Sequence, residues 1–394
     1  MLPLLPPEAR LLVLAIRPPG PESEEEISRL ARSGLDWQLL GRLAEHENVT
    51  PILWQRLRPH AAAVPPELAH RLRGQAVVTE FRMAMTESVL EDVVTRLTAG
   101  GIPVLLMKGA ALAKTVYASF AERPMGDLDL LVPAAEAERG WKSLVSSGWR
   151  VEFVGHEEFY GRHHHLPGLL DPKGLNLILE LHRALLPVGG PFALDEGEIW
   201  REARPIRVGN AEALVPRAEP LLLHLCIHFA WSHMLSDGLS RAVRDVGALL
   251  AKDRVDWDRF VELAGLARAS SCAYWTLLMA QEIGGAQVPR EVLRRLIPPG
   301  LGPMREPILR GLTSSALYRA CPSITVLKRL WTSAIQPAAS GHGDSRPWDL
   351  SEEFAKAFKR RPPASIPERL RRQVRSWGDW MRFASTMGLP RRLL

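Results

Sequence analysis

Two aspartates separated by one residue, Asp127 and Asp129, are the best candidates for chemistry in this sequence. Alternate side chains of a β-strand share one face and lie about 6.6 Å apart, so both carboxylates point to one side. Leu128, Leu130 and Val132 then point to the other side. Paired carboxylates suit two Mg²⁺ ions about 3.5–4 Å apart, the arrangement used for in-line phosphoryl chemistry. Two solvated aspartates at a strand end would give the same pattern.

A second group of residues has the chemistry to bind phosphate. The apolar run 102–107 predicts a buried strand, and Lys108 and Gly109 separate it from a helix-forming stretch at 110–117. N–H groups at a helix N-terminus bind anions, and Lys108 adds a positive charge. Arg123 precedes the aspartate strand and offers a bidentate phosphate contact. Two alternatives stay open, because Lys108 could instead pair with an aspartate and Arg123 could brace the aspartate loop.

Longer runs around these residues resemble a known family. They are LLMKGAALAKTVYASFAERPMGDLDLLV (105–132), ILELHRAL (178–185), and LLHLCIHFAWSH followed by RAVRDVGALL. These runs resemble the nucleotidyltransferase-fold proteins called the uncharacterised nucleotidyltransferase family, distant relatives of DNA polymerase β, over roughly residues 30–260. The segment KG…Y…RPMGDLDLLV is the most specific part of this resemblance.

The resemblance implies an α+β fold with a small mixed-sheet nucleotidyltransferase domain flanked by helical regions. It also implies two Mg²⁺ ions on the aspartates and transfer of a nucleotidyl group from an NTP to a hydroxyl or phosphate acceptor. Similar proteins occur in peptide natural-product pathways, so a peptide or small molecule is the favoured acceptor. Unlike the wider superfamily, which begins its phosphate loop with Gly-Ser, this chain has Lys108-Gly109, and the separation from Gly109 to Asp127 is longer than usual.

The superfamily's third carboxylate falls on a later strand, where Glu180 is the candidate, with Glu152 and Asp171 as alternatives. In the stretch 176–182, leucines form one face while Glu180 and His182 form the other. Asp127, Asp129 and Glu180 are therefore the expected catalytic residues and metal ligands, and Glu180 could accept the acceptor's proton. The expected nucleotide contacts are Lys108, Gly109, Arg123 and His182. A hydrogen-bonded histidine at a sheet end is the alternative for His182.

Histidines occur in two further patterns. His163, His164 and His165 are consecutive, and the first and third would share a strand face, but a zinc site lacks a third ligand at motif spacing and is not expected here. His224 and His228 are four residues apart on an expected helix, without the glutamate of a zincin motif, so packing beside the cleft is expected. Arg241 and Asp245 have the spacing of a helix salt bridge.

The elements that position these residues divide the chain into four ranges. We expect an N-terminal helical region at 1–100, the nucleotidyltransferase domain at 101–215, a helical domain at 216–335, and a linker with a basic tail at 336–394. The domain should contain strands at 102–107, 127–132, 149–154, 163–166 and 175–183, and the later helices include one from 257 to 283.

Charge and composition limit the function classes. The chain has 394 residues and a net charge of +6, and residues 356–394 carry eleven Lys or Arg and two acidic residues. This basic amphipathic tail could contact an anionic partner or pack on the protein itself. We expect a soluble cytoplasmic protein, because the three cysteines are far apart, no apolar stretch is long enough for a membrane span, and no export signal is recognisable. The alternative function is a non-catalytic module that binds a nucleotide, a nucleic acid or a partner protein.

Overall fold

A computed structural model describes residues 5–152, 163–187, 189–299, 301–302, 305–318, 331 and 334–335. Its first part is helical, as predicted, with Asp36 capping the third helix through a hydrogen bond from the Leu39 N–H. The helices are α1 (Pro7–Ile16), α2 (Pro21–Ala31), α3 (Trp37–His46), α4 (Thr50–Leu57), the 3₁₀ turn η2 (Arg58–Ala63) and the long α5 (Pro66–Ala99). Glycines at 100 and 101 end α5, the latter with a positive φ.

A seven-stranded mixed sheet follows, in the order β3-β4-β5-β2-β1-β7-β6, and it confirms the expected α+β class. Its elements are β1 (Leu105–Leu106), α6 (Lys108–Thr115), η3 (Phe120–Glu122), β2 (Asp127–Leu131), η4 (Ala134–Glu136), α7 (Ala137–Ser146), β3 (Arg150–Val151), β4 (Leu169–Leu170), β5 (Ile178–His182), α9 (Glu196–Glu202), β6 (Arg204–Val208) and β7 (Ala211–Val215). The pairs β2 with β5 and β1 with β7 are parallel, whereas the other neighbours are antiparallel.

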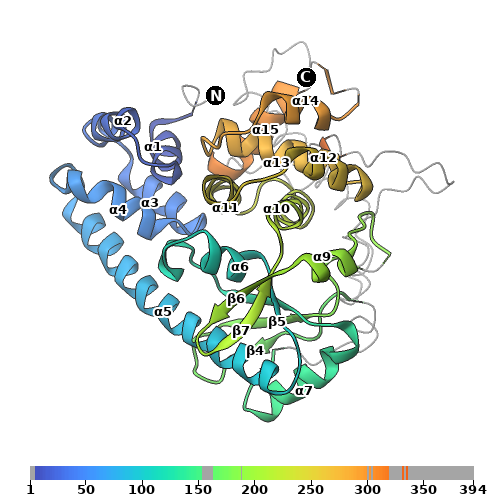
Figure 1. The fold of residues 1–394 in the computed structure, drawn as a ribbon. Helices are drawn as coiled ribbons and strands as arrows, with labels where there is room; N and C mark the ends of the chain where they lie inside the picture. The colour runs from blue at the N-terminus through green and yellow to red at the C-terminus, as the bar shows by residue number, and fades with distance from the viewer. Residues whose placement is uncertain are drawn as a thin grey trace, which may run out of the picture.

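Helices cover both faces of the sheet. α5 packs on β6 and β7, and α7 packs on β5, so these two helices share one face. A smaller apolar cluster of Leu105, Met107, Leu131, Leu185 and Ile199 covers part of the other face, beneath α9. α9 and α10 lie above the sheet in Figure 1, opposite α5 and α7.

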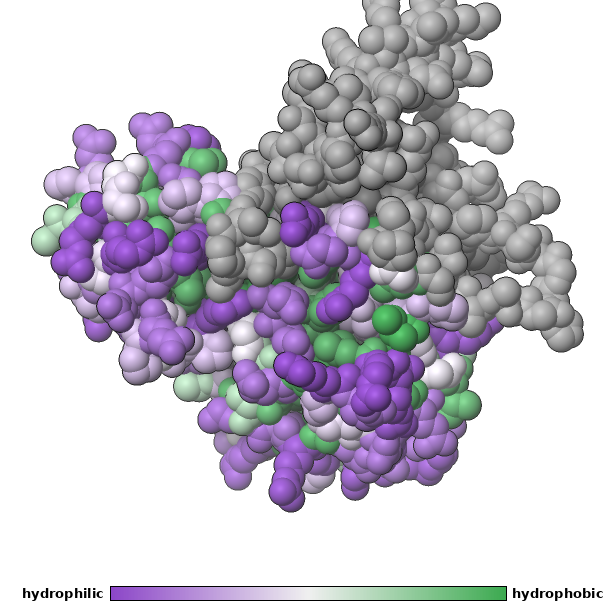
Figure 2. Space-filling model, turned by 90° about the horizontal axis from the view of Figure 1, so that it is seen from above, coloured by the Kyte–Doolittle hydropathy of each residue, from purple (hydrophilic) through white to green (hydrophobic). Residues whose placement is uncertain are grey.

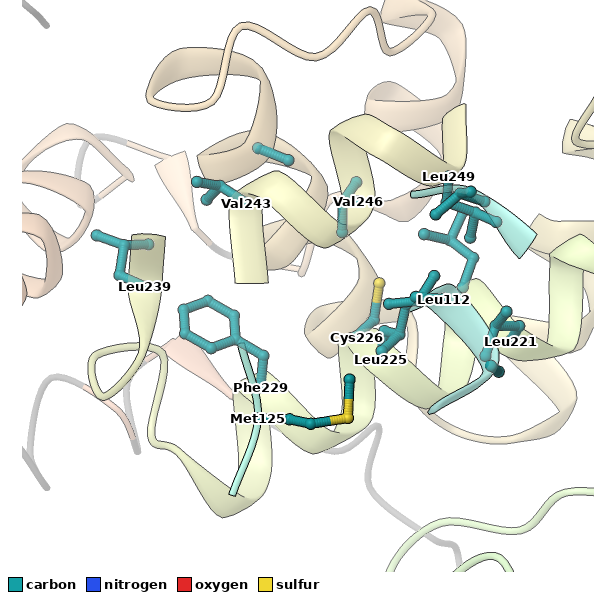
Figure 3. Packing of buried hydrophobic residues seen from close by; sticks show 14 of the residues in the cluster. Leu112, Met125, Leu221, Leu225, Cys226, Phe229, Leu239, Val243, Val246 and Leu249 are labelled. Atoms are coloured by element: carbon teal, nitrogen blue, oxygen red, sulfur yellow. The ribbon is translucent and has the colours of Figure 1, made fainter. Parts of the chain in front are cut away.

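The later helices bring the rest of the chain against the sheet. They are α10 (Ala218–Ile227), the π-helical turn η5 (His228–Ser232), α11 (Leu239–Lys252), α12 (Trp257–Leu266), α13 (Ser270–Glu282), α14 (Arg290–Leu296) and α15 (Arg305–Tyr318). In Figure 3, Leu112 of α6 and Met125 before β2 lie among Leu225, Phe229 and Val246 of this layer. The apolar contacts therefore fix the start of β2 against α10 and α11.

Three predicted elements differ from the structure. The segment 257–283 is two helices rather than one, because Arg268 adopts a left-handed conformation with φ 59° between α12 and α13. Residues 163–166 form only an isolated bridge from His165 to His182, not a strand. The strand predicted at 102–107 has two paired residues, Leu105 and Leu106.

The linker and basic tail from residue 336 onward lie outside the described residues, so the predicted tail contact stays a prediction. None of the helices in the described part of the chain combines the length and apolarity needed to cross a bilayer. Hydrophilic residues predominate over the coloured surface in Figure 2, with apolar patches interspersed among them.

Candidate active site

The pairing of β2 with β5 places Asp129 and Glu180 side by side. The two strands are parallel and in register, so Asp129 is opposite Glu180 and Leu131 is opposite His182. Because alternate residues share a face, Asp127 lies on the same side as Asp129, while Leu179 and Leu181 enter the main core. One ligand atom from each of Asp129, Glu180 and His182 lies within 4.8 Å of the others. Asp129 and Glu180, two of the three predicted carboxylates, thus meet at neighbouring strand positions, while Asp127 lies outside this close group.

Two cationic side chains converge on Asp129. Lys108 Nζ lies 2.6 Å from Asp129 Oδ1, and His182 Nε2 lies 3.0 Å from the same oxygen and 3.4 Å from Glu180 Oε2. Burial alone would raise the pKa of Asp129, but Lys108 and His182 more than offset it and hold that pKa well below its usual range. Burial would lower the pKa of His182, yet its bonds to Asp129 and Glu180 raise it. The buried carboxylate is therefore ionised and matched by positive charge.

Asp127 has a different environment at the start of β2. It is exposed, whereas Asp129 is 4% exposed. Even so, loss of hydration and the neighbouring charge of Asp129 raise the pKa of Asp127. Of the three predicted carboxylates, Asp127 is the most exposed to solvent.

Lys108 turns the chain sharply from β1 into α6. Its φ is 44°, a left-handed conformation that is rare in a residue with a Cβ. This turn sends the side chain toward the carboxylates, where Asp129 and Glu180 raise the pKa of Lys108 against the opposing effect of burial. Of the two roles predicted for Lys108, the structure shows the ion pair with an aspartate, here Asp129. Its contact with a nucleotide phosphate stays a prediction.

Arg123 is buried in an ion pair with α11. Its Nη2 and Nε lie 2.8 and 3.1 Å from Asp245 Oδ2, and Tyr117 donates its hydroxyl proton to Asp245 Oδ1 at 2.8 Å. Asp245 therefore pairs with Arg123, and within the described residues it forms no ion pair with Arg241, contrary to the predicted helix salt bridge. Arg123 braces the loop before β2, and its predicted phosphate contact stays a prediction.

The histidine run lies beside the carboxylates. The ring centroid of His163 lies 4.2 Å from that of His164 and 4.2 Å from that of His165. The Nε2 atom of His165 lies 3.9 Å from Glu180 Oε2. Burial and neighbouring imidazoles lower the pKa of His163 to about 3. Residue spacing did not reveal this convergence, because a bend rather than a strand carries the three side chains.

Helix α10 and the π-helical turn contribute further imidazoles near the site. His224 is 5% exposed, and burial lowers its pKa to about 3, with a smaller lowering by the charge of Lys108. His228 Nε2 lies 3.1 Å from His233 Nε2. His233, just after the π-helical turn, is a partner of His228 that sequence reasoning missed, although π-helical turns often occur at functional sites.

Asp171 and Glu152, the alternatives to Glu180 as the third carboxylate, lie elsewhere in the structure. Asp171 is buried and accepts N–H bonds from Lys173, Leu175 and Leu177, so it holds the turn between β4 and β5. Glu152 is exposed at the end of β3, on the far side of β4 from β5. Glu180 is the carboxylate that lies beside Asp129.

Comparison with protein families agrees with this geometry. The family described as "Uncharacterised nucleotidyltransferase" matches residues 33–285, more than half of the chain. The chain belongs to this family. Comparison with curated proteins and with solved structures gives no match. The nucleotidyltransferase family match extends from α3, through the whole sheet, to the end of α13.

Proposed function

We propose that this nucleotidyltransferase family member moves a nucleotidyl group from an NTP to a hydroxyl or phosphate acceptor with Mg²⁺. The observation that carries the proposal is the register of β2 and β5, which aligns Asp129 with Glu180 and places Asp127 on the same face. Family membership supports the reaction class. A peptide or a small molecule is the acceptor that we propose.

The donor set fits Mg²⁺. Asp127, Asp129 and Glu180 offer carboxylate oxygens, the ligands that this hard cation prefers, and an oxygen of Asp129 lies within 4.8 Å of one of Glu180. When bound, the ions would neutralise phosphate charge and favour ionisation of the acceptor hydroxyl. The hydrogen bond from His182 lowers the pKa of Glu180 despite burial, so Glu180 is ionised at neutral pH and able to accept a proton.

Lys108 and His182 are proposed to bind the nucleotide's phosphates. Both lie within 3.0 Å of Asp129, so a phosphate near this carboxylate also lies within reach of their N–H donors. Gly109 follows Lys108 at the start of α6, where backbone N–H groups point toward an anion. Arg123 would act indirectly, by holding the loop that leads into β2.

Thermal unfolding with each of the four NTPs, with and without Mg²⁺, tests the proposal. A ligand at about 100 times its Kd adds about 2.7 kcal/mol to stability, which gives a measurable rise in Tm. We expect a Mg²⁺-dependent rise with at least one NTP in the wild type, and its loss in Asp127→Asn and Glu180→Gln. Asp127 is exposed, so its substitution should leave the fold intact.

The matched control is Glu138→Gln, which removes an exposed carboxylate on α7 and should keep the full NTP effect. The absence of any rise in the folded wild type would contradict the proposal. A rise that needs no Mg²⁺ and survives both substitutions would instead favour the non-catalytic binding module.

A further inference from the structure

Three consecutive imidazoles gather on one side of the backbone at residues 163–165. Neighbouring side chains of an extended strand point to opposite faces, so a strand would separate His164 from the other two. Here the ring centroids of His163 and His165 are 4.2 Å apart, and those of His164 and His165 are 5.0 Å apart. The centroid of His182 on β5 lies 5.1 Å from that of His164. The bend thus forms a compact imidazole cluster.

The nitrogen atoms of this cluster have nearly the spacing of a metal site. One ligand nitrogen from each of His163, His164 and His165 lies within 4.8 Å of the other two. With Zn–N bonds of about 2.0–2.1 Å, tetrahedral ligand nitrogens are about 3.4 Å apart. Binding of an ion would therefore draw the three nitrogens closer together, and all three rings are only partly buried.

The hydrogen bonding of His165 prepares one nitrogen for a cation. Its Nδ1 lies 2.7 Å from the Leu166 carbonyl oxygen, which can only accept, so Nδ1 carries the proton. In the neutral ring the lone pair is on Nε2, which lies 3.9 Å from Glu180 Oε2. A cation bound between Nε2 and this carboxylate oxygen would contact both. A backbone carbonyl that fixes the tautomer in this way is the usual support of a metal-binding histidine.

His164 provides a second observation. Its Nδ1 is buried and, among the described residues, makes no hydrogen bond. A buried ring nitrogen without a partner has a desolvation cost that ligation of a cation would remove. Imidazole nitrogen and carboxylate oxygen together suit Zn²⁺ and similar borderline ions better than Mg²⁺, which prefers oxygen alone.

We infer that His163, His164 and His165, with Glu180 as a fourth ligand, bind one transition metal ion of the Zn²⁺ class beside the Mg²⁺ carboxylates. The bend adds His164 to the predicted pair of His163 and His165, and its bridge from His165 to His182 brings it beside strand β5, which carries Glu180. The ion attaches the 163–165 bend to β5 and orients Glu180. Binding at this site needs no nucleotide.

Zinc titration of the full-length, tag-free protein tests the site. After removal of metals with a chelator, Zn²⁺ affinity is measured by competition with a chromophoric chelator. Visible absorption with Co²⁺ then reports nitrogen ligands and tetrahedral geometry. We expect one tight equivalent in the wild type and a loss of more than about 100-fold in affinity when all three histidines become glutamine, since losing an outer-shell partner alone costs about 10–100-fold.

Matched variants separate this site from other histidines and from the Mg²⁺ site. His60→Gln/His70→Gln removes two histidines of the N-terminal helical region and should bind Zn²⁺ as the wild type does. Asp127→Asn should also keep Zn²⁺ binding, while Glu180→Gln should weaken it at least tenfold. Circular dichroism checks folding, and His164→Gln replaces the triple variant if that variant does not fold.

Two results would overturn the inference. One is a wild type that binds no Zn²⁺ more tightly than the triple variant does. The other is a tight Zn²⁺ ion that survives all three histidine substitutions, which would place it elsewhere in the chain. Because neither measurement uses NTP or Mg²⁺, either result leaves the proposed nucleotidyl transfer to be judged by its own thermal unfolding test.

Discussion

At the scale of single residues, Gly109 leaves the space that the Arg123 guanidinium occupies. A Cβ built at this position would lie 3.0 Å from Arg123 Nη1 and 3.2 Å from Arg123 Cζ. Arg123 is held by Asp245 and is 7% exposed, so it has little freedom to move away. The glycine after Lys108 is therefore required by packing, in addition to any contact of its N–H with phosphate.

We predict that Gly109→Ala destabilises the protein by about 1–3 kcal/mol, the usual cost of overpacking a buried site. The control is Gly247→Ala on α11, where a Cβ meets open space. Alanine in a helix interior gains about 0.5–1 kcal/mol over glycine, so the control should be slightly stabilised. Chemical unfolding measures both, and equal stability of the two variants would contradict the close contact with Arg123.

The candidate site was partly predictable from residue types and alternation. Successive side chains of a strand alternate between its two faces, so the sequence alone puts Asp127 on the same face as Asp129 and Glu180 on the same face as His182. The register that puts Asp129 opposite Glu180 depends on tertiary pairing, so the sequence could not supply it. The partner of Arg123 was not predictable either, since Asp245 lies more than one hundred residues away.

At the scale of elements, one buried ion pair fastens α11 to the loop before β2. Asp245 accepts hydrogen bonds from Arg123 and from Tyr117, and the latter lies just beyond α6. Both charges are almost completely buried, at 8% and 5% side-chain exposure. The pair therefore connects α11, the loop before β2 and the segment just after α6.

We predict that Asp245→Asn costs about 3–5 kcal/mol, because it leaves the Arg123 charge buried without a compensating carboxylate. The control is Asp253→Asn at the end of α11, whose ion pair with Arg204 is partly exposed and should contribute at most about 1 kcal/mol. Urea unfolding of the two variants gives the comparison. Similar small losses in both would mean that the buried pair does not hold these elements together.

Element boundaries show which local signals were sufficient. The helical character predicted for residues 1–100 is confirmed, and the long helix α5 ends at Gly100, where that predicted region also ends. The hairpin of β6 and β7 was missed, although its two-residue Gly209-Asn210 connection is a known hairpin signal. The break between α12 and α13 falls at Arg268, a residue type that gives no turn signal, so its position was not predicted.

At the scale of the whole molecule, one apolar cluster joins all three predicted helical and sheet regions. It includes Leu11 in α1, Leu130 in β2 and Trp275 in α13. Elements that share a core lose stability together, so an unfavourable charge buried in one of them is expected to weaken the whole fold. Histidines buried in neutral form are the groups most sensitive to mild acid.

We therefore predict that stability falls as the pH drops below about 6.5, the usual pKa of histidine in an unfolded chain. Burial lowers the folded-state pKa of His224 to about 3, so between these values the unfolded chain binds a proton that the folded protein does not. The stability from neutral His224 is thus fully present above pH 6.5 and is lost toward pH 3. From pH 7.5 to 5.5 this one group accounts for about 1.4 kcal/mol of the fall in unfolding free energy.

Chemical unfolding at the two pH values, with a metal chelator present, measures this fall. The fall should be smaller by about 1.4 kcal/mol in His224→Gln than in the wild type. It should be unchanged in His70→Gln, whose side chain is exposed on α5. Equal pH dependence in the wild type and in His224→Gln would mean that His224 gains its proton without unfolding.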